Sequence, residues 1–266
     1  QNANLDEASF GGRIGEASRV VCKNDALKYR MSKKSRKLHE NNEIYIHDLD
    51  SYSAGMHNCL SVPLDKLLEK GFKTRQTDVR PAGSVNTAMQ LVAVLFQIQS
   101  LQQFGGVAAT HLDWTMVPYV RLSFYKHFKD GVKWLVDDPV TYAISKTEVK
   151  SLSIEDDLYN KYPKAKAYAI EQTRKEVFQA VEGMYHNLNT LQSRSGNQLP
   201  FSSINYGTGT MPEHRMIMKN VLLATDAGLG GGETPIFPVQ IFKVKDGINT
   251  KEGNNHTNPG LVRTTA

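Results

Sequence analysis

The chain has 266 residues, of which 40% are hydrophobic and 22% charged, and its formal net charge is +5. This length can bury a substantial core in one large domain or two small ones. Two cysteines in so long a chain argue against a disulfide scaffold and favour a reducing compartment, so we expect a cytoplasmic protein. The sequence has neither the pattern of a signal peptide at its start nor an apolar run long enough to cross a membrane.

The positive residues are spread over several stretches, most of which also carry acids. Mixed charge at helical spacing is typical of solvated helix faces. A mild positive excess suits an anionic ligand such as a nucleoside triphosphate. It is too weak and too scattered to predict a nucleic-acid partner.

Residues 16–38 are predicted to be mostly helical, with Ser32 as the N-cap of the second half. The run Ile-Tyr-Ile at residues 44–46 has the β-branched and aromatic character of a buried strand. A short helix over residues 65–70 should end at Gly71.

Residues 84–104 form the most regular predicted helix, which the Gly-Gly pair at 105–106 should end. Its amide side chains favour either a face that contacts another helix or a ligand, or an ordinary exposed polar face. These amides are Gln90, Gln97, Gln99, Gln102 and Gln103. A second amphipathic helix is predicted over residues 117–133, with Pro118 in its first turn.

Residues 137–162 are acidic and predict an irregular excursion before a long helix at 165–190. Two further strands are predicted at 199–204 and 234–243, on either side of a helix at 211–228. Strands separated by long helices indicate an α/β protein with wide crossovers.

Polar and reactive side chains follow the first predicted strand within the stretch IYIHDLDSYSAGMHNCL. Two histidines, two carboxylates, an amide and a thiol lie at this strand end, where parallel α/β folds usually place their chemistry. The alternative is that His47 and Asp48 cap a turn and Cys59 is a small buried hydrophobic residue. The spacing alone does not separate these two interpretations.

Other chemical motifs are weak. The sequence contains no CxxC, HExxH or GxSxG motif and no carboxylate-rich loop, so we expect no metal site. A hydrolytic set of Cys59, His47 and Asp48 is conceivable on residue type, but no oxyanion loop accompanies it. The glycine runs at 105–106 and 230–232 fit no phosphate-binding fingerprint and are interpreted as helix stops.

Five segments, in order along nearly the whole chain, resemble the anaerobic (class III) ribonucleoside-triphosphate reductases, which are glycyl-radical enzymes. The segments are NANLDEASFGGRIGEAS, then IYIHDLD followed by MHNCL, QLVAVLFQIQSLQQFGGVAATHLD, YHNLNTLQSRSGNQLPFSSINYGTGT and ETPIFPVQIFKVKDGIN. One short motif would be weak support, whereas five in the family's order are strong support.

The resemblance implies the first half of a ten-stranded α/β barrel with long dimer-forming helices, and a single partial catalytic domain over residues 1–266. It implies radical reduction of ribonucleoside triphosphates to 2′-deoxyribonucleotides with formate as reductant. A separate S-adenosylmethionine iron–sulfur activase would install the glycyl radical, and the enzyme would be a homodimer.

Residue roles also come from the resemblance. Cys59 matches the active-site cysteine proposed to donate a hydrogen atom at the 2′ face of the substrate, and His47 and Asn58 would contact the ribose. The helices at about residues 84–135 match those that bind a deoxynucleoside triphosphate or ATP effector across the dimer. Lysine suits phosphate and glutamine suits a base or sugar, so the effector candidates are Gln97, Gln102 and Lys126.

The family's thiyl cysteine, its radical glycine and its four-cysteine zinc site match positions beyond Ala266, and Cys22 does not match the thiyl position. Both ends of the chain look cut, so we expect a fragment or a split gene product that binds nucleotide without turnover. Two alternatives are another glycyl-radical lyase and a non-catalytic nucleotide-binding regulatory or split-subunit fragment.

Overall fold

The computed structural model describes residues 9–55, 57–103, 105–136, 144–193 and 198–250. Internal contacts divide the chain into two compact units. The first unit comprises Gln1–Leu60, Phe96–Val107 and Thr190–Phe201, and the second comprises Ser61–Leu95, Ala108–Asn189 and Ser202–Ala266. Within the described residues, no helix is long and apolar enough to span a membrane.

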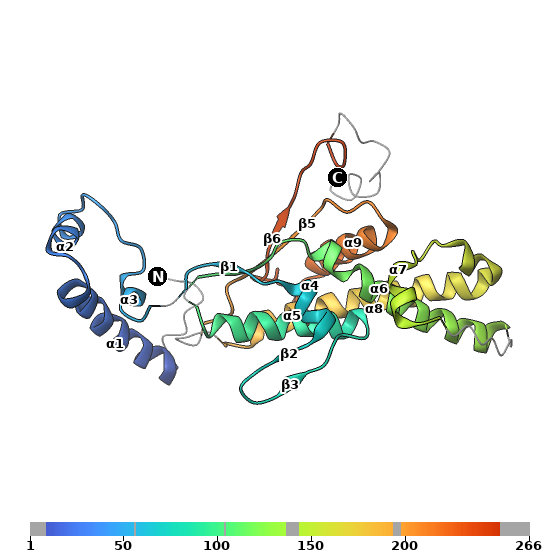
Figure 1. Ribbon diagram of the computed structural model, residues 1–266, viewed down its shortest axis with the longest axis horizontal. Coiled ribbons are helices and arrows are strands. Elements are labelled where there is room, and N and C mark those ends of the chain that lie inside the picture. Colours follow the sequence, from blue (N-terminus) through green and yellow to red (C-terminus); the bar gives the residue numbers. More distant parts are fainter. Residues whose placement is uncertain (1–8, 56, 104, 137–143, 194–197, 251–266) are drawn as a thin grey trace. The chain divides into compact units, whose positions relative to one another are not determined.

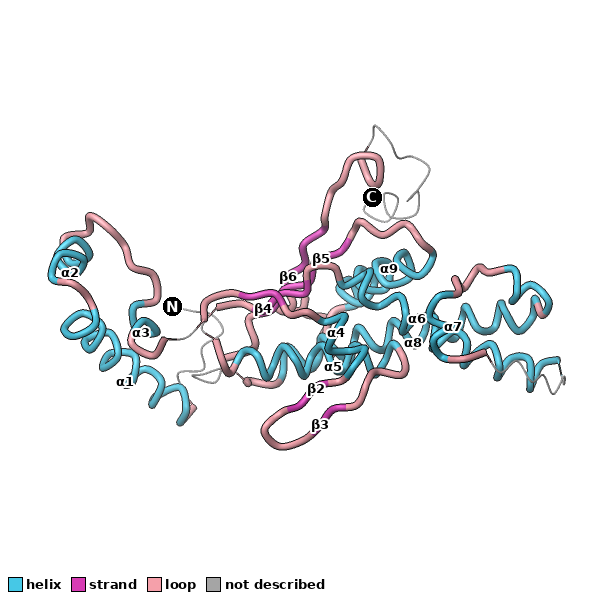
Figure 2. Tube along the Cα trace, in the orientation of Figure 1, coloured by secondary structure: helices cyan, strands magenta, loops and turns pink. Residues whose placement is uncertain are grey.

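Four short strands form one sheet in the order β1-β4-β5-β6, drawn in magenta in Figure 2. β5 and β6 pair in parallel, from Ser203 opposite Val239 to Tyr206 opposite Phe242. The expected α/β class is therefore confirmed, and the sheet of the described residues is open and does not close into a barrel. The strands are β1 Leu60–Ser61, β4 Val107–Ala109, β5 Ser202–Tyr206 and β6 Val239–Phe242.

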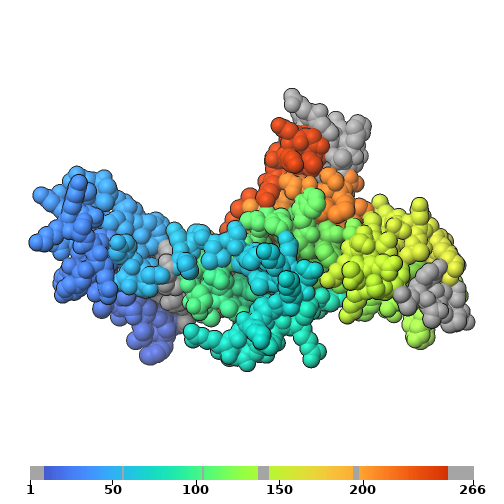
Figure 3. Space-filling view, in the orientation of Figure 1, coloured from blue at the N-terminus to red at the C-terminus, as the bar shows by residue number. Residues whose placement is uncertain are grey.

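The amino-terminal part of the first unit is helical, as predicted, and forms a continuous body (blue in Figure 3). Ser9 caps α1 by accepting from the Gly12 N–H, and Ser32 caps α2 by accepting from the Ser35 N–H. Arg19 on α1 forms an ion pair with Asp50 on α3 at 3.1 Å. The elements are α1 Phe10–Asp25, a π-helical turn Ala26–Arg30, α2 Lys33–Glu40 and α3 Leu49–Tyr52.

The prediction of a strand at residues 44–46 is wrong. The Ile44 N–H donates to the Leu38 carbonyl, and the Ile46 N–H donates to Nδ1 of His39. These bonds fold the segment back over the end of α2, and Tyr45 is left 80% exposed. An apolar run of three residues cannot by itself distinguish a strand from such a return loop.

The remaining helices lie mainly in the second unit, and Figure 1 shows α6 and α8 running alongside each other. Gly71, with φ 76°, ends α4 as predicted. A hairpin of β2 and β3 follows α4. The elements are α4 Leu64–Lys70, β2 Phe72–Lys73, β3 Asp78–Val79, α5 Val85–Ser100, α6 Leu112–Gly131, a π-helical turn Val132–Val136, α7 Lys146–Ser151, a 3₁₀ turn Asp157–Lys161, α8 Pro163–Thr190 and α9 Pro212–Ala227.

The core of the second unit forms around α6. Phe124 and Phe128 each meet the ring of Tyr159 edge-on, with centroids 4.9 Å apart. Offset and edge-on aromatic pairs add roughly 0.5–1.5 kcal/mol beyond the area they bury. This cluster also ties the 3₁₀ turn of the acidic segment to α6. The described residues 144–162, where an irregular excursion was expected, contain α7 and this turn and pack against the core, and residues 137–143 lie outside the described residues.

Helix boundaries differ from the predictions in two places. α5 ends at Ser100, before the Gly-Gly pair, because 3₁₀-type bonds from Leu101 and Gln102 tighten the chain there. α6 begins at Leu112, so Pro118 lies inside the helix and not in its first turn. A buried Leu112 and the hydrogen bonds of Asp113 to the β5 loop favour this earlier start over the proline signal.

The two later strands exist but are shorter than predicted. β5 begins at Ser202, three residues after the predicted start, and β6 occupies only the second half of the segment 234–243. The backbone N–H groups of Ile236 and Phe237 donate to Oδ1 of Asn189. Because that side chain already satisfies them, the proline-containing half of the segment is held without strand pairing.

A buried ion pair links α6 to α9. Arg121 and Glu213 are 9% and 0% exposed, and Nε of Arg121 donates to Oε1 of Glu213 at 2.7 Å. The same oxygen accepts from the Ile154 N–H, and the guanidinium also donates to the Lys150 carbonyl at 2.9 Å. One carboxylate thus connects three parts of the second unit.

We predict that Glu213→Ala lowers the free energy of unfolding by about 3–5 kcal/mol, because it leaves the Arg121 charge buried without its partner. Denaturant unfolding measures the change. Glu155→Ala, at an exposed carboxylate, serves as the control and should stay within about 0.5 kcal/mol of wild type. Equal stability of the two variants would contradict the assignment.

Candidate active site

Cys59 lies on an extended segment that pairs in parallel with the residues leading into β4. His57 and Gln103 form an isolated parallel bridge. The Gly105 N–H donates to the Asn58 carbonyl at 3.0 Å, and the Leu60 N–H donates to the Gly106 carbonyl at 3.1 Å. These bonds fix the backbone on both sides of Cys59.

The thiol of Cys59 is exposed and held between two polar groups. The Gly106 N–H donates to its Sγ at 3.2 Å, and the thiol faces Oδ1 of Asn58 at 3.5 Å. The structure thus brings Cys59 and Asn58 together, and it excludes the alternative that Cys59 is a buried core residue. An accessible, oriented S–H can deliver a hydrogen atom to a bound ligand.

Gly105 is required by the close approach of two chain segments. A Cβ at this position would lie 2.6 Å from Sγ of Cys59 and 2.6 Å from the carbonyl carbon of Asn58, closer than real Cβ contacts come. The helix-stop interpretation of the Gly-Gly pair does not include this role. The role depends on pairing with residues 57–60, which no local pattern around the pair indicates.

Gln103 holds the same segment in place through side-chain hydrogen bonds. Its side chain is 1% exposed, and Nε2 donates to the carbonyls of Gly105 and Gly106 at 3.0 and 2.6 Å. Gln99 in turn donates to Oε1 of Gln103 at 3.0 Å. Two of the five amides of α5 and its extension therefore hold the glycine pair in place.

His47, the other ribose-contact candidate, lies in the loop before α3. It forms an ion pair with Asp48, and its ring meets Tyr45 edge-on with centroids 6.3 Å apart. Its side chain is 74% exposed. Asp48 adopts a left-handed backbone conformation, φ 52°, at the N-cap of α3. These contacts are local, so a role for His47 at the substrate stays a prediction.

Two of the effector candidates, Gln97 and Gln102, lie on α5 and its extension. Gln90 is already engaged, because Nδ2 of Asn187 on α8 donates to its Oε1 at 2.8 Å. Gln97 is half-buried, and Gln102 is exposed just beyond the helix end. The structure thus assigns Gln90, Gln99 and Gln103 to packing, and a ligand contact of Gln97 and Gln102 stays a prediction.

Lys126, the third effector candidate, is exposed on α6 beside a half-buried polar network. Glu176 on α8 accepts from Ser123 at 2.9 Å and bonds Nε2 of His127 at 2.7 Å. The Ser123 hydroxyl also accepts from the Val85 N–H at the start of α5. Three helices therefore meet at Glu176, next to the lysine proposed to bind phosphate.

The pKa of Glu176 is lowered from its ordinary value of 4.5. Burial alone would raise this pKa, but hydrogen bonds from His127 and Ser123 and the positive charges of His127 and Lys126 favour the ionised form.

Among the described residues, no group of three or more histidine, cysteine or acidic side chains could hold a metal ion.

A sequence model of one family, described as anaerobic ribonucleoside-triphosphate reductase, matches residues 1–266. The chain belongs to this family. It is 32% identical to the anaerobic ribonucleoside-triphosphate reductase of Enterobacteria phage T4 over 256 residues, 94% of this chain and 37% of that protein. It is 29% identical to the enzyme of Escherichia coli K12 over 96% of this chain and 32% of that protein.

Solved structures support the same fold at low sequence identity. An anaerobic ribonucleotide reductase aligns with a TM-score of 0.53 at 16% identity, over 89% of this chain and 34% of its own. The Thermotoga maritima anaerobic ribonucleotide reductase with citrate in the active site aligns with a TM-score of 0.51 at 16% identity, over 88% and 40%. The chain thus spans about a third of the curated reductases that it matches.

We predict that Gly105→Ala lowers the free energy of unfolding by about 1–3 kcal/mol, because the added methyl group overlaps Cys59 and Asn58. The reaction rate of the Cys59 thiol with a disulfide reagent, measured in a Cys22→Ser background, should change as well. Gly83→Ala is the matched control, since a Cβ at Gly83 meets nothing within 4 Å. Identical effects of the two substitutions would refute the close-approach argument.

Glu176 should make stability depend on pH. Its folded-state pKa lies below 4.5, so the ionised carboxylate stabilises the fold above pH 4.5, and this contribution is lost as the pH falls through the folded-state pKa. Glu176→Gln should therefore be less stable than wild type at neutral pH, by a difference that shrinks below pH 4.5.

Denaturant unfolding across this pH range measures the difference. Glu171→Gln is the control on the same helix, because its side chain is 44% exposed against 18% for Glu176. A gap between Glu176→Gln and wild type that does not change with pH would exclude this contribution.

Proposed function

We propose that this chain supplies the hydrogen-donor cysteine and the effector-binding helices of an anaerobic ribonucleoside-triphosphate reductase. The observation that carries the proposal is the Cys59 thiol, exposed and oriented by Asn58 and Gly106. Family membership over the whole chain supports it. The two compact units would then be parts of one catalytic domain.

In this reaction the 2′ C–OH bond of a ribonucleoside triphosphate is replaced by C–H. Formate provides two electrons and becomes carbon dioxide, and the hydroxyl leaves as water after taking up a proton. Cys59 delivers a hydrogen atom to the 2′ carbon and regains one from formate, whose second electron completes the reduction. Asn58 and His47 hydrogen-bond the ribose. The glycyl radical, on a glycine that the resemblance places outside this chain and installed by an iron–sulfur activase, would supply the unpaired electron for this chemistry.

The proposed effector is ATP or a deoxynucleoside triphosphate, bound at the helices of residues 84–135 in a homodimer. Lys126 provides an exposed ammonium for phosphate, while Gln97, half-buried on α5, and Gln102, exposed beyond its end, would bind the base or the sugar. The hydrogen bonds of Glu176 to His127 and Ser123 support this assignment, because they fix α6 on either side of Lys126.

In the full-length enzyme that contains this chain, Cys59→Ser should reduce deoxyribonucleotide formation to background and leave effector affinity unchanged. A hydroxyl has a stronger bond to hydrogen than a thiol and cannot replace it as donor. Lys126→Ala should instead weaken effector binding by at least about tenfold, or 1.4 kcal/mol. Activity assays and calorimetric titration with dATP, dGTP and dTTP separate the two effects.

Lys219→Ala is the control for Lys126→Ala, because Lys219 is an exposed lysine on α9. Full activity in Cys59→Ser would sink the catalytic assignment and favour a regulatory, nucleotide-binding role for this chain. Equal effector affinities of Lys126→Ala and Lys219→Ala would remove Lys126 from the effector site.

A further inference from the structure

A cavity of about 650 Å³ lies within the second unit and plays no part in the proposed reaction. His111, which follows β4, and Thr208, which follows β5, both line it. The cavity therefore lies at the carboxyl ends of these strands, where α/β sheets bind ligands. Its volume is within the range of small-molecule sites, roughly 300–1,000 Å³.

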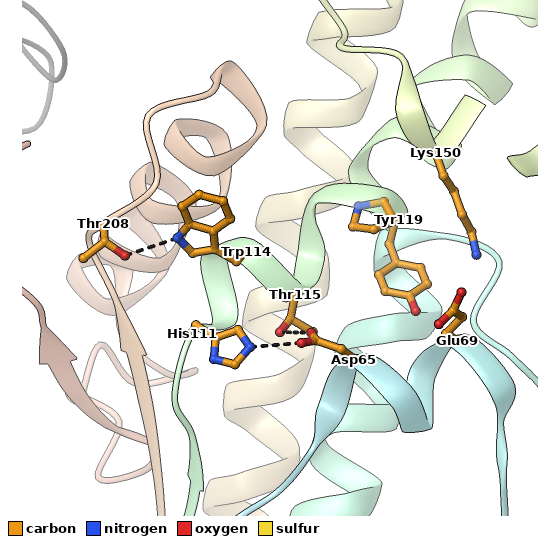
Figure 4. A pocket seen from close by; sticks show the side chains of 9 residues that line it. Asp65, Glu69, His111, Trp114, Thr115, Tyr119, Lys150 and Thr208 are labelled. Carbon is orange, nitrogen blue, oxygen red and sulfur yellow. Dashed lines mark hydrogen bonds and ion pairs between the residues drawn. The ribbon is translucent and has the colours of Figure 1, made fainter. Parts of the chain in front are cut away.

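One wall of the cavity is acidic. Asp65 and Glu69 are four residues apart on α4, so both carboxylates lie on one face of the helix. Figure 4 shows Asp65 held between His111 and Thr115, with His111 Nε2 at 3.0 Å and Thr115 Oγ1 at 2.5 Å. Burial alone would raise the pKa of Asp65, but these hydrogen bonds lower it, so the carboxylate is ionised at neutral pH.

Aromatic side chains form the opposite walls. Nε1 of Trp114 donates to Oγ1 of Thr208 at 3.2 Å, and its ring packs on His214 with centroids 4.3 Å apart. These contacts fix the indole, which is 47% exposed. Burial, with the charges of Glu69 and Asp65, raises the pKa of Tyr119 to about 12, so its ring stays neutral.

The chain's own Lys150 already places a cation here. Its Nζ lies 5.9 Å from the centroid of the Tyr119 ring, within the distance at which a cation is attracted to an aromatic face. In Figure 4 the Lys150 side chain extends toward Tyr119 and Glu69. Among the residues that line the cavity, two carboxylates thus face one lysine and His111, whose Nε2 is bonded to Asp65.

We propose that this cavity binds a cationic nitrogen group, an alkylammonium or guanidinium, between the carboxylates of Asp65 and Glu69 and the aromatic faces of Tyr119 and Trp114. The cation would be paired by the acids and would stack on a ring, and it would balance the excess negative charge of the lining. A phosphate-bearing ligand would instead meet two carboxylates and a single lysine.

The test is a titration of the 266-residue chain with agmatine, which carries both an alkylammonium and a guanidinium. The chain has two tryptophans, so a Trp134→Phe background leaves Trp114 as the fluorescent reporter inside the cavity. Agmatine should shift the Trp114 emission, and Glu69→Gln should weaken binding about tenfold or more. Glu182→Gln, a carboxylate of α8 outside the cavity, should leave the affinity unchanged.

Lys150→Met gives the sharpest result, because removing the competing ammonium should strengthen agmatine binding. A cavity for anions would show the reverse, and weaker agmatine binding in Lys150→Met would overturn the proposal. Circular dichroism of each variant checks that it is folded. Because the measured change in Lys150→Met is a gain of affinity, a folding defect cannot imitate it.

The same chemistry could be carried by a free amine or by a protein side chain, so N-acetylarginine amide is titrated beside agmatine. Tighter binding of agmatine identifies a free amine as the ligand. Tighter binding of the arginine amide identifies the arginine or lysine of a protein segment. No emission change and no heat of binding with either compound would overturn the proposal.

Discussion

The carboxylate of Asp113 accepts hydrogen bonds from the backbone N–H groups of Gly207 and Gly209, both at 3.1 Å, and the side chain is 1% exposed. This contact joins the first turn of α6 to the loop that leaves β5. Most of the second unit depends on the position of α6, which also carries Arg121 toward α9 and Ser123 toward α8. Both N–H bonds end on Oδ2 of Asp113, so they offset part of the cost of burying the carboxylate and fix the helix against the sheet.

α6 also contributes residues to both proposed binding regions of the second unit. Its first turns carry Trp114 and Tyr119 into the cavity, and its later turns carry Lys126 beside the Glu176 network. In the first unit a different constraint operates. There the missing side chain of Gly105 lets the backbone approach Asn58 and Cys59, so the thiol is positioned by hydrogen bonds to the backbone and a neighbouring amide.

Local sequence signals predicted elements whose ends are set by local chemistry. Ser32 caps its helix, Gly71 ends another, and the long helix expected at 165–190 appears as α8. They failed where the partner lies outside the element itself. The run at 44–46 is folded back by hydrogen bonds to Leu38 and His39. The start of α6 is set by the hydrogen bonds of Asp113 to the loop after β5 rather than by Pro118.

The sequence by itself determined the family and the α/β class, and it placed Asn58 next to Cys59. Motifs in a fixed order and adjacent residues need no folding to be recognised. Only the tertiary structure decided what surrounds them. Gly105 lies 46 and 47 residues from Cys59 and Asn58, and Asp65 lies 46 and 50 residues from His111 and Thr115, and no local periodicity relates them. Their proximity arises from strand pairing and helix packing, which depend on the burial of the whole chain.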